Sequence, residues 1–316
     1  MEKRRLGNSE LEVGPLTFGG NVFGWTTDEA MSFRLLDGFL DQGYDFIDSA
    51  DVYSRWHPGN KGGESEVIIG NWLAARGNRS KVIVATKLGM DMGGDNKGLS
   101  RAYMMRAVED SLRRLRTDYI DLYQAHRDDP ATPLDETLSA FQTLIQQGKV
   151  RVIGSSNYSA ARLQEALDTS KRLNLPRYQS HQPLYSLVER AEFEGPLEDV
   201  CLKENLGVIG FYSLASGFLT GKYRSRADME GRARAPRVEK YINDAGMRVL
   251  AALDAAAAVH NAKPGQVALA WLLARPAVTA PIVSATNMDQ LAEMCAAPRI
   301  KLTAAEVAAI DAASKP

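Results

Sequence analysis

The chain has 316 residues, of which 45% are hydrophobic and 24% charged, the composition of a globular protein with a sizeable core. Its net charge of −1 argues against nucleic-acid binding, which uses basic surfaces. Two cysteines, Cys201 and Cys295, suggest neither a disulfide framework nor a metal cluster, and they favour the reducing cytoplasm. No signal peptide and no apolar run long enough for a membrane span is visible.

Short apolar segments alternate with helical patterns along the chain. The segments that predict strands are residues 16–20, 45–50, 82–87, 120–126, 150–157, 178–182, 207–213 and 278–285. Most are rich in Val, Ile and Phe and apolar on both faces, which is typical of parallel strands covered by helices. Before the first of them, Gly7 and Asn8 lie between alternating residues and predict a hairpin beneath the fold.

Helices are predicted between these strands. The clearest covers residues 132–148, with Thr132 as the expected N-cap and Pro133 at the first helical position. The same pattern predicts helices that start from caps at Ser100, Ser159 and Thr303. The alternation predicts an α/β fold, a closed (β/α)8 TIM barrel with a short N-terminal β-hairpin, as one domain over residues 1–316.

Three stretches predict long loops, namely residues 21–29, 51–63 and 214–245, and the last is rich in Arg, Gly and Pro. Each follows a predicted strand. In a barrel of this type the loops after strands lie at the end that carries the active site.

Ionisable residues gather at three neighbouring strand exits. Asp48 ends the second strand and Tyr53 follows it by five positions, while Lys87 ends the third strand and His126 the fourth. Each alone has an ordinary explanation, such as a polar strand end, loop packing or a hydrogen-bonded core histidine. Their conjunction on consecutive strands favours a catalytic group.

These four residue types suit carbonyl reduction. The ordinary pKa of a tyrosine hydroxyl is about 10, which is high for an acid at neutral pH. Lys87 is expected to stabilise the phenolate and lower that pKa, with Asp48 as its counter-ion. His126 is expected to donate a hydrogen bond to the substrate carbonyl oxygen. The set then protonates an alkoxide that forms when hydride is delivered.

Several segments resemble the signature segments of the aldo-keto reductases: DFIDSADVYS (45–54), VIVATK (82–87), IDLYQAH (120–126), GKVRVIGSSN (148–157) and YSLASGFLTGKY (212–223). They occur in the family's order and span nearly the whole chain. The resemblance implies a (β/α)8 barrel, the tetrad Asp48, Tyr53, Lys87 and His126, and NADP(H) bound without a Rossmann domain. It implies no metal.

The resemblance also implies a set of cofactor residues. Ser156, Asn157 and Gln182 match the family's partners of the nicotinamide carboxamide; from the residues alone Gln179 competes with Gln182, but the following Pro-x-Tyr favours Gln182. Tyr212 matches the residue that stacks on the nicotinamide. Further expected contacts are Gly20, Asn21 and Asp48 around the nicotinamide and Ser213, Leu214, Ser216, Gly217 and Lys222 in a cradle for the pyrophosphate. Each segment also has an ordinary reading as a turn, a core aromatic or a flexible loop.

The last strand departs from the family pattern. Members often carry an arginine there that holds the ribose 2′-phosphate, whereas this chain has Thr286. Ser284, Thr286 and Gln290 are expected to hydrogen-bond the phosphate, and Arg224 is a possible source of the missing charge. The resemblance therefore favours NADP(H), while the missing arginine weakens the preference over NAD(H).

Trp25 and Trp56 are expected on active-face loops, either as an apolar wall for the substrate, together with Tyr53 and His126, or as loop packing. The sequence thus predicts an NADP-dependent reductase of aldehydes or ketones, acting reversibly on a small carbonyl compound, with no nucleic-acid or membrane partner. The alternative is a nucleotide-sensing binding subunit with little turnover. Hydrolysis or isomerisation has little support, since no paired carboxylates or metal site are visible. Substrate identity, reaction direction and oligomeric state are not encoded in any recognisable motif.

Overall fold

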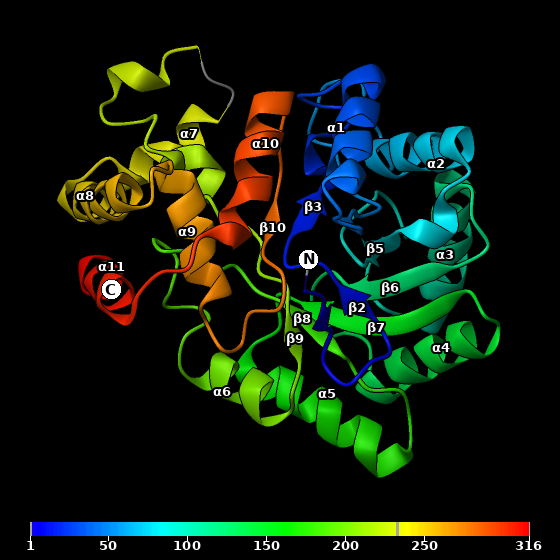
Figure 1. Cartoon of the computed structure of the whole chain (residues 1–316). Helices are drawn as coiled ribbons and strands as arrows, with labels where there is room; N and C mark the ends of the chain where they lie inside the picture. Colours follow the sequence, from blue (N-terminus) through cyan, green and yellow to red (C-terminus); the bar gives the residue numbers. More distant parts are fainter. Residues whose placement is uncertain (1, 232–233, 316) are drawn as a thin grey trace.

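The computed structural model describes residues 2–231 and 234–315, and its main sheet contains the eight strands that the sequence predicts (Figure 1). All neighbouring strands run parallel, in the order β10-β3-β4-β5-β6-β7-β8-β9. Their bounds are β3 Thr17–Gly19, β4 Phe46–Asp48, β5 Ile83–Leu88, β6 Ile120–Ala125, β7 Val150–Ser156, β8 Ser180–Gln182, β9 Gly207–Val208 and β10 Ile282–Val283.

The sheet closes on itself. The first strand pairs with the last, with Thr17 opposite Ile282. On its other side, the amide of Ile282 donates to the carbonyl of Gly210 at 2.9 Å, and the amide of Thr279 donates to Val208 at 2.8 Å. The predicted (β/α)8 barrel is therefore confirmed.

Strands β9 and β10 are much shorter than the sequence predicts. Pro281 has no amide hydrogen for the ladder, and it directly precedes β10. Beyond β9, Tyr212 has a φ of 68°, which no strand accommodates. The segments around both strands keep only isolated contacts, such as the bridge between Val208 and Val278.

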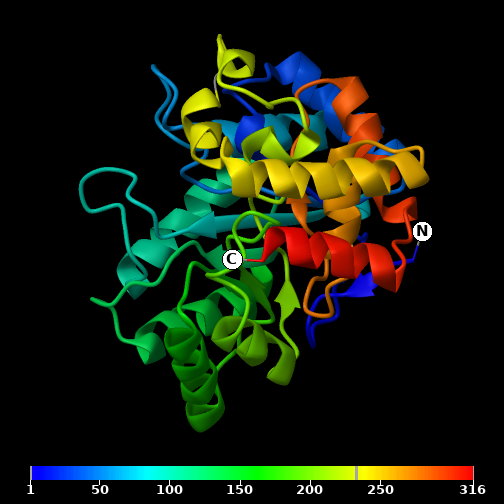
Figure 2. The same ribbon diagram turned by 90° about the vertical axis from the view of Figure 1, so that its left-hand side faces the viewer.

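Helices surround the barrel (Figures 1 and 2). Their bounds are α1 Glu29–Asp41, α2 Glu64–Arg76, α3 Arg101–Leu115, α4 Leu134–Gln146, α5 Ala160–Leu173, α6 Pro196–Lys203, α7 Ala235–Val238, α8 Asp244–Val259, α9 Pro264–Leu273, α10 Met288–Ala296 and α11 Ala304–Ser314. Figure 2 shows α8 and α11 side by side, and α8 also packs against α9. None of the helices in the described ranges is long and apolar enough to cross a membrane.

Three of the four predicted helix caps are confirmed. Ser100 and Ser159 accept hydrogen bonds from the amides three residues on, and Thr303 forms a capping box with Glu306. The prediction for Thr132 is wrong: α4 begins at Leu134, and the Thr132 hydroxyl donates to the Asp129 carboxylate at 2.6 Å. Pro133 has an extended backbone with a ψ of 142°, so Pro133 is itself the N-cap and the helix starts after it.

The long loop predicted over residues 214–245 contains short helices. It includes the 3₁₀ segment η3 (Ala215–Thr220) and helix α7, which lie on either side of a longer connection. Helical segments as short as these, with six and four residues, have no hydrophobic period that a sequence pattern could reveal.

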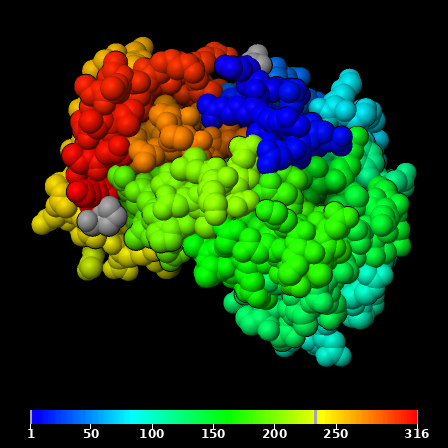
Figure 3. All heavy atoms as spheres, turned by 90° about the horizontal axis from the view of Figure 1, so that it is seen from below, coloured from blue at the N-terminus to red at the C-terminus, as the bar shows by residue number. Residues whose placement is uncertain are grey.

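The predicted hairpin is confirmed and closes one end of the barrel. It consists of β1 (Arg4–Arg5) and β2 (Glu12–Val13). Leu6, Leu11 and Val13 pack against inward-facing barrel residues, namely Phe46, Ala85, Leu122, Val152, Ile209 and Ala280. Figure 3 shows the N-terminal segment, in blue, on this end of the molecule. The opposite end, at the carboxyl ends of the strands, remains for a site.

Shortening a side chain in the N-terminal hairpin that closes the barrel is expected to destabilise the fold. Leu6 is fully buried in it, so Leu6→Ala should lower the free energy of unfolding by about 2–5 kcal/mol. Leu202, on α6, is 46% exposed, and Leu202→Ala should cost less than about 1 kcal/mol. Urea titration followed by circular dichroism measures both values. Equal losses in the two variants would contradict the plugging role of the hairpin.

Candidate active site

Strand exits bring the predicted catalytic residues to one end of the barrel. Asp48 is the last residue of β4, Lys87 lies next to the end of β5, and His126 directly follows β6. In register, Asp48 is opposite Ala85, two residues before Lys87, and Lys87 is opposite Gln124. Because the strands are parallel, these side chains share the carboxyl-terminal face.

Lys87 joins Asp48 to Tyr53. Its Nζ donates to Asp48 Oδ2 at 2.6 Å, to the Tyr53 hydroxyl oxygen at 2.9 Å and to the Ser49 carbonyl at 2.7 Å. Lys87 and Asp48 are wholly buried, whereas Tyr53 is partly exposed. The carboxylate, ammonium and phenol therefore form the contiguous chain that the sequence predicts.

The second oxygen of Asp48 accepts from two amides. Gln182 Nε2 donates to Asp48 Oδ1 at 3.0 Å, and Gln124 Nε2 does so at 3.3 Å. A buried carboxylate is stable only when its lone pairs are satisfied, and here each oxygen has partners. The side-chain nitrogen of Gln182 thus donates to Asp48, while Gln182 also lines the cavity described below.

The pKa of Tyr53 shifts in the direction opposite to that expected. Enclosure in the protein raises it well above 10, and the charge of Asp48 and the hydrogen bond to it act in the same direction. The predicted lowering by Lys87 is thus wrong for this arrangement, because the ammonium is shared with a nearer carboxylate. Burial lowers the pKa of Lys87 itself, against the opposing influence of Asp48. Tyr53 accordingly holds its proton at neutral pH.

His126 is neutral. Burial lowers its pKa well below 6.5, and the charges of Lys87 and Arg127 act in the same direction. Its ring lies 6.0 Å from that of Tyr53 in an edge-on arrangement. Its Nδ1 is buried and has no hydrogen-bond partner among the described residues. A neutral imidazole carries one N–H, which suits hydrogen-bond donation to an uncharged ligand oxygen.

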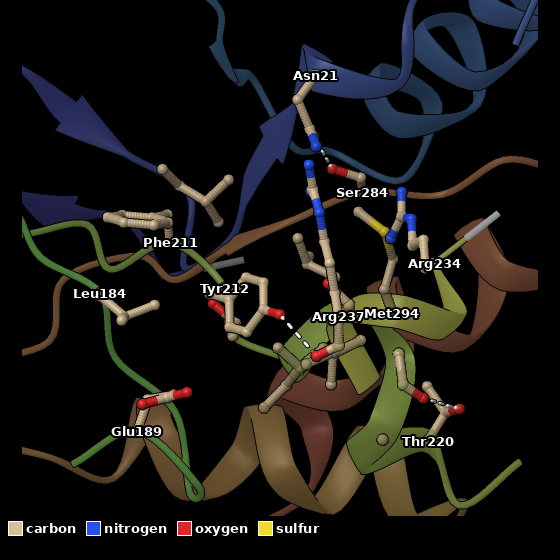
Figure 4. A pocket seen from close by; sticks show the side chains of 18 of the residues that line it. Asn21, Leu184, Glu189, Phe211, Tyr212, Thr220, Arg234, Arg237, Ser284 and Met294 are labelled. Carbon is tan, nitrogen blue, oxygen red and sulfur yellow. Dashed lines mark hydrogen bonds between the residues drawn. The ribbon is translucent and has the colours of Figure 1, made fainter. Parts of the chain in front are cut away.

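Tyr53 and His126 line a cavity of about 820 Å³. Figure 4 shows another part of its wall, around Tyr212 and Ser284. Most of the predicted cofactor and substrate residues line this cavity: Asn21, Tyr53, Trp56, His126, Ser156, Asn157, Gln182, Tyr212, Ser213, Leu214, Ser216, Gly217, Lys222, Ser284 and Gln290. They come from both ends of the chain and from the segments after β3, β4, β6, β7, β8, β9 and β10. This volume is within the range of small-molecule and cofactor sites.

Other predicted residues lie behind this wall. Asp48 and Lys87 are fully buried and contact the wall residues Gln182 and Tyr53 by hydrogen bonds. Gly20 packs closely against α2: a side chain at this position would place its Cβ 2.8 Å from Ser65 Oγ. Trp25 packs edge-on against Trp56 with ring centroids 5.6 Å apart, and the Thr286 hydroxyl donates to Gln290. These positions support residues of the wall.

Arg224 faces away from the cavity. Its guanidinium donates to the Gly221 carbonyl and to Asp254 Oδ1, both at 2.8 Å, and the pair is exposed to solvent. The sequence-based suggestion that Arg224 supplies the charge for a phosphate is therefore not supported by its position.

Four basic residues of the wall escaped the sequence analysis, namely Arg234, Arg237, Lys240 and Lys263. In Figure 4, Arg234 and Arg237 extend toward Ser284 and Asn21. Arg234 Nη2 is buried without a hydrogen-bond partner in the described part of the chain. Lys240 and Lys263 are paired, with Glu189 and Glu293 respectively. For Arg234, Arg237 and Lys240 the signal in the sequence is the abundance of arginine between residues 214 and 245, and Lys263 lies outside that segment.

Backbone strain is concentrated around the cavity. Asn157, Tyr212 and Ser216 line it with positive φ values of 57°, 68° and 57°, and Ser54, with 70°, follows Tyr53. A left-handed conformation costs most residues about 1–3 kcal/mol, and such residues occur often at functional sites. Their grouping marks this end of the barrel as the functional one. Within residues 2–231 and 234–315, no group of three His, Cys, Asp or Glu side chains is suited to hold a metal ion.

The chain matches known proteins along nearly its whole length. The sequence model of the Aldo/keto reductase family matches residues 15–315. An uncharacterized oxidoreductase of Bacillus subtilis (strain 168) is 38% identical, over 96% of this chain and 92% of its own. The L-glyceraldehyde 3-phosphate reductase of Escherichia coli (strain K12) is 32% identical, over 93% and 86%.

A plant relative has a different description. The "Probable voltage-gated potassium channel subunit beta" of Oryza sativa subsp. japonica is 34% identical, over 93% of this chain and 90% of its own length. The match to the family model nevertheless extends over the barrel and over every segment that lines the cavity. This chain is a member of the aldo-keto reductase family, and so an oxidoreductase with a (β/α)8 barrel.

Proposed function

We propose that the chain is an NAD(P)H-dependent oxidoreductase that reduces aldehyde or ketone carbonyls to alcohols, reversibly, with Tyr53 as the proton donor. The observation that supports it most directly is the position of Lys87 Nζ, within hydrogen-bond distance of both Asp48 Oδ2 and the Tyr53 hydroxyl, under a cavity of cofactor size.

The proposed roles follow from protonation states. Tyr53 is protonated at neutral pH because its pKa is raised, and it gives that proton to the substrate oxygen as hydride transfer turns this oxygen into a strongly basic alkoxide. Lys87 donates to the phenolate that remains, and Asp48 holds Lys87 in its charged form. His126, being neutral, orients the carbonyl oxygen through its N–H. The nicotinamide, when bound, supplies the hydride.

The cavity wall fits a dinucleotide. Ser156 and Asn157 present a hydroxyl and an amide beside Gln182, as hydrogen bonding to a carboxamide requires. Tyr212 offers a ring face for stacking, and residues 213–222 offer small side chains and amides near Lys222 for a pyrophosphate.

Preference for NADP(H) has a candidate source in Arg234. The segment after β10 carries no basic residue at Thr286, but Arg234 lines the same cavity as Ser284 and Gln290. Its buried, unpartnered Nη2 is costly unless an anion binds there, because a buried charge requires a partner. A 2′-phosphate supplies that charge.

The substrate side of the cavity is aromatic. Trp56 is 42% exposed and lies edge-on to Tyr53, with centroids 6.0 Å apart. Trp25 supports Trp56 from behind. An exposed indole beside the proton donor favours an apolar or aromatic portion in the carbonyl compound.

The second candidate function is nucleotide sensing with little turnover, which the plant relatives described as potassium channel subunits favour. The two functions are distinguished by NADPH consumption across a panel of aldehydes. Tight NADPH binding without turnover of any of them would support the sensing function.

Removal of the Tyr53 hydroxyl should stop catalysis without preventing cofactor binding. Tyr53→Phe leaves no proton to donate, so kcat for aldehyde reduction should fall by at least about 100-fold. Loss of NADPH absorbance measures the rate, and protein fluorescence measures NADPH binding. Tyr119→Phe, at the far end of the barrel before β6, is the matched control. A Tyr53→Phe variant with unaltered kcat would exclude Tyr53 as the donor.

Removal of Lys87 should cost both activity and stability. Lys87→Met leaves the buried carboxylate of Asp48 unpaired, and such a loss typically costs about 3–5 kcal/mol. Adding Asp48→Asn removes the unpaired charge, so the double variant should regain stability but remain inactive. Thermal unfolding and the reductase assay are the measurements. A double variant as unstable as Lys87→Met would contradict the ion-pair explanation.

Arg234→Ala should discriminate between the two cofactors. The loss of a charge-assisted hydrogen bond should raise the Kd of NADPH about tenfold or more, and leave that of NADH nearly unchanged. Arg224→Ala provides the matched control, since that guanidinium is turned toward Asp254. Fluorescence titration gives the Kd of each nucleotide for the unaltered chain and for both variants. Equal weakening of NADPH and NADH by Arg234→Ala would place the 2′-phosphate elsewhere.

A further inference from the structure

A second buried carboxylate lies on the loop that carries Tyr53. Asp51 is only 2% exposed, and its side chain lies on the α2 and α3 side of β5, behind Lys87. Its Oδ1 has no hydrogen-bond partner among the described residues, and its Oδ2 accepts a long bond of 3.5 Å from the Tyr103 hydroxyl, with the neighbouring Val52 amide as a further donor to the side chain. Buried carboxylates normally have close, charged or multiple partners, so Asp51 is an exception.

One guanidinium faces two carboxylates in this region. Arg114 Nε donates to Glu66 Oε2 at 2.6 Å, and the Thr86 hydroxyl donates to Glu66 Oε1. Glu66 therefore has both its charge and its lone pairs compensated, although it is fully buried. No salt bridge to Asp51 occurs in the described part of the chain, so the geometry fits a neutral, protonated Asp51 next to the paired Glu66.

The backbone next to Asp51 is held in place at several points. The amides of Ser49 and Asp51 donate to the carbonyls of Ala85 and Lys87, which extends the pairing with β5 past the end of β4. Three residues further, the Ser54 hydroxyl donates to the Phe23 carbonyl at 2.5 Å. Tyr53 lies between these anchors. Its hydroxyl reaches Lys87 only while the segment of residues 49–54 keeps this path.

We propose that Asp51 is a positioning residue that acts as the neutral carboxylic acid: its burial between α2 and α3 holds the segment of residues 49–54 so that Tyr53 meets Lys87, and its ionisation releases that segment. Ionisation leaves a buried carboxylate without a salt bridge of its own, beside the carboxylate of Glu66. The charge is relieved when the side chain turns toward water, and Tyr53, two residues along the same loop, moves with it.

The surrounding groups set the pH at which this occurs. Burial raises the pKa of Asp51 to about 8, and Glu66 from α2 acts in the same direction; Arg114 from α3, the Val52 amide and Lys87 from β5 oppose it. The other groups that face it are the hydroxyls of Tyr103 and Tyr123 from α3 and β6, which remain protonated because burial raises their pKa values. Asp51 is thus protonated below about pH 8 and ionised above it.

The test compares Asp51→Asn with the unaltered chain. The asparagine has nearly the shape of the protonated acid but cannot ionise. Reduction of benzaldehyde by NADPH is measured from about pH 6 to about pH 10, and the ¹³C resonance of the Tyr53 ring carbon that bears the hydroxyl is followed over the same range, assigned with Tyr53→Phe. Asp110→Asn, a half-exposed carboxylate on α3, is the control.

The unaltered chain and Asp110→Asn should lose kcat above about pH 8, with a shift of the Tyr53 resonance at the same midpoint. Asp51→Asn should keep kcat within about threefold below that pH and show neither change near it, whereas Asp51→Ala should lose about tenfold or more in kcat with NADPH binding intact. An unaltered chain whose Tyr53 resonance does not change near that midpoint, or an Asp51→Asn variant that retains the change, overturns the proposal. The inference rests on the proposed reductase function, but the resonance is observed without turnover, so failure of one is distinguishable from failure of the other.

Discussion

A lysine and an aspartate that have no contact with solvent, Lys87 and Asp48, lie behind the cavity wall, in hydrogen-bond contact with Tyr53 and Gln182. Removing two charges from water is unfavourable, and their mutual attraction offsets this only when the remaining polar atoms are also satisfied. Lys87 therefore has three acceptors, and Asp48 has Gln124 and Gln182 on its second oxygen. These partners come from β4, β5, β6 and β8 and the loop after β4, so the ion pair depends on a correctly closed barrel.

The burial of this ion pair also explains why Tyr53, the proposed proton donor, is on a loop. A tyrosine on a strand next to Lys87 would be as buried as the lysine and out of reach of a substrate. From the loop after β4, Tyr53 touches Lys87 on one side and the cavity on the other. The loop itself then requires support, which Ser54 and the buried side chain of Asp51 provide from two directions.

Much of this arrangement could be predicted from the sequence, because it depends on local patterns. Apolar segments placed the strands, and a parallel barrel brings every strand exit to one end, so Asp48, Lys87 and His126 were predicted together. Features that depend on distant contacts were not predictable. Arg234 and Arg237 lie in a segment without periodicity, and only the folded chain directs them at the cavity. The pKa of Tyr53 was predicted in the wrong direction because burial and the competing carboxylate of Asp48 are properties of the fold. The position of Thr132 before Pro133 predicts a helix cap, whereas in the fold its hydroxyl hydrogen-bonds to the Asp129 carboxylate.

The seam between β3 and β10 also determines when this protein becomes functional during its synthesis. Arg4 donates to the carbonyl of Val278, a contact that spans 274 positions, and Thr17 pairs opposite Ile282. A nascent chain on the ribosome therefore exposes the edge of β3 until nearly the last strand has emerged. Contacts of such long range form slowly, and unpaired strand edges favour aggregation. Both walls of the cavity, one near residue 21 and one near residue 290, meet only in that final step.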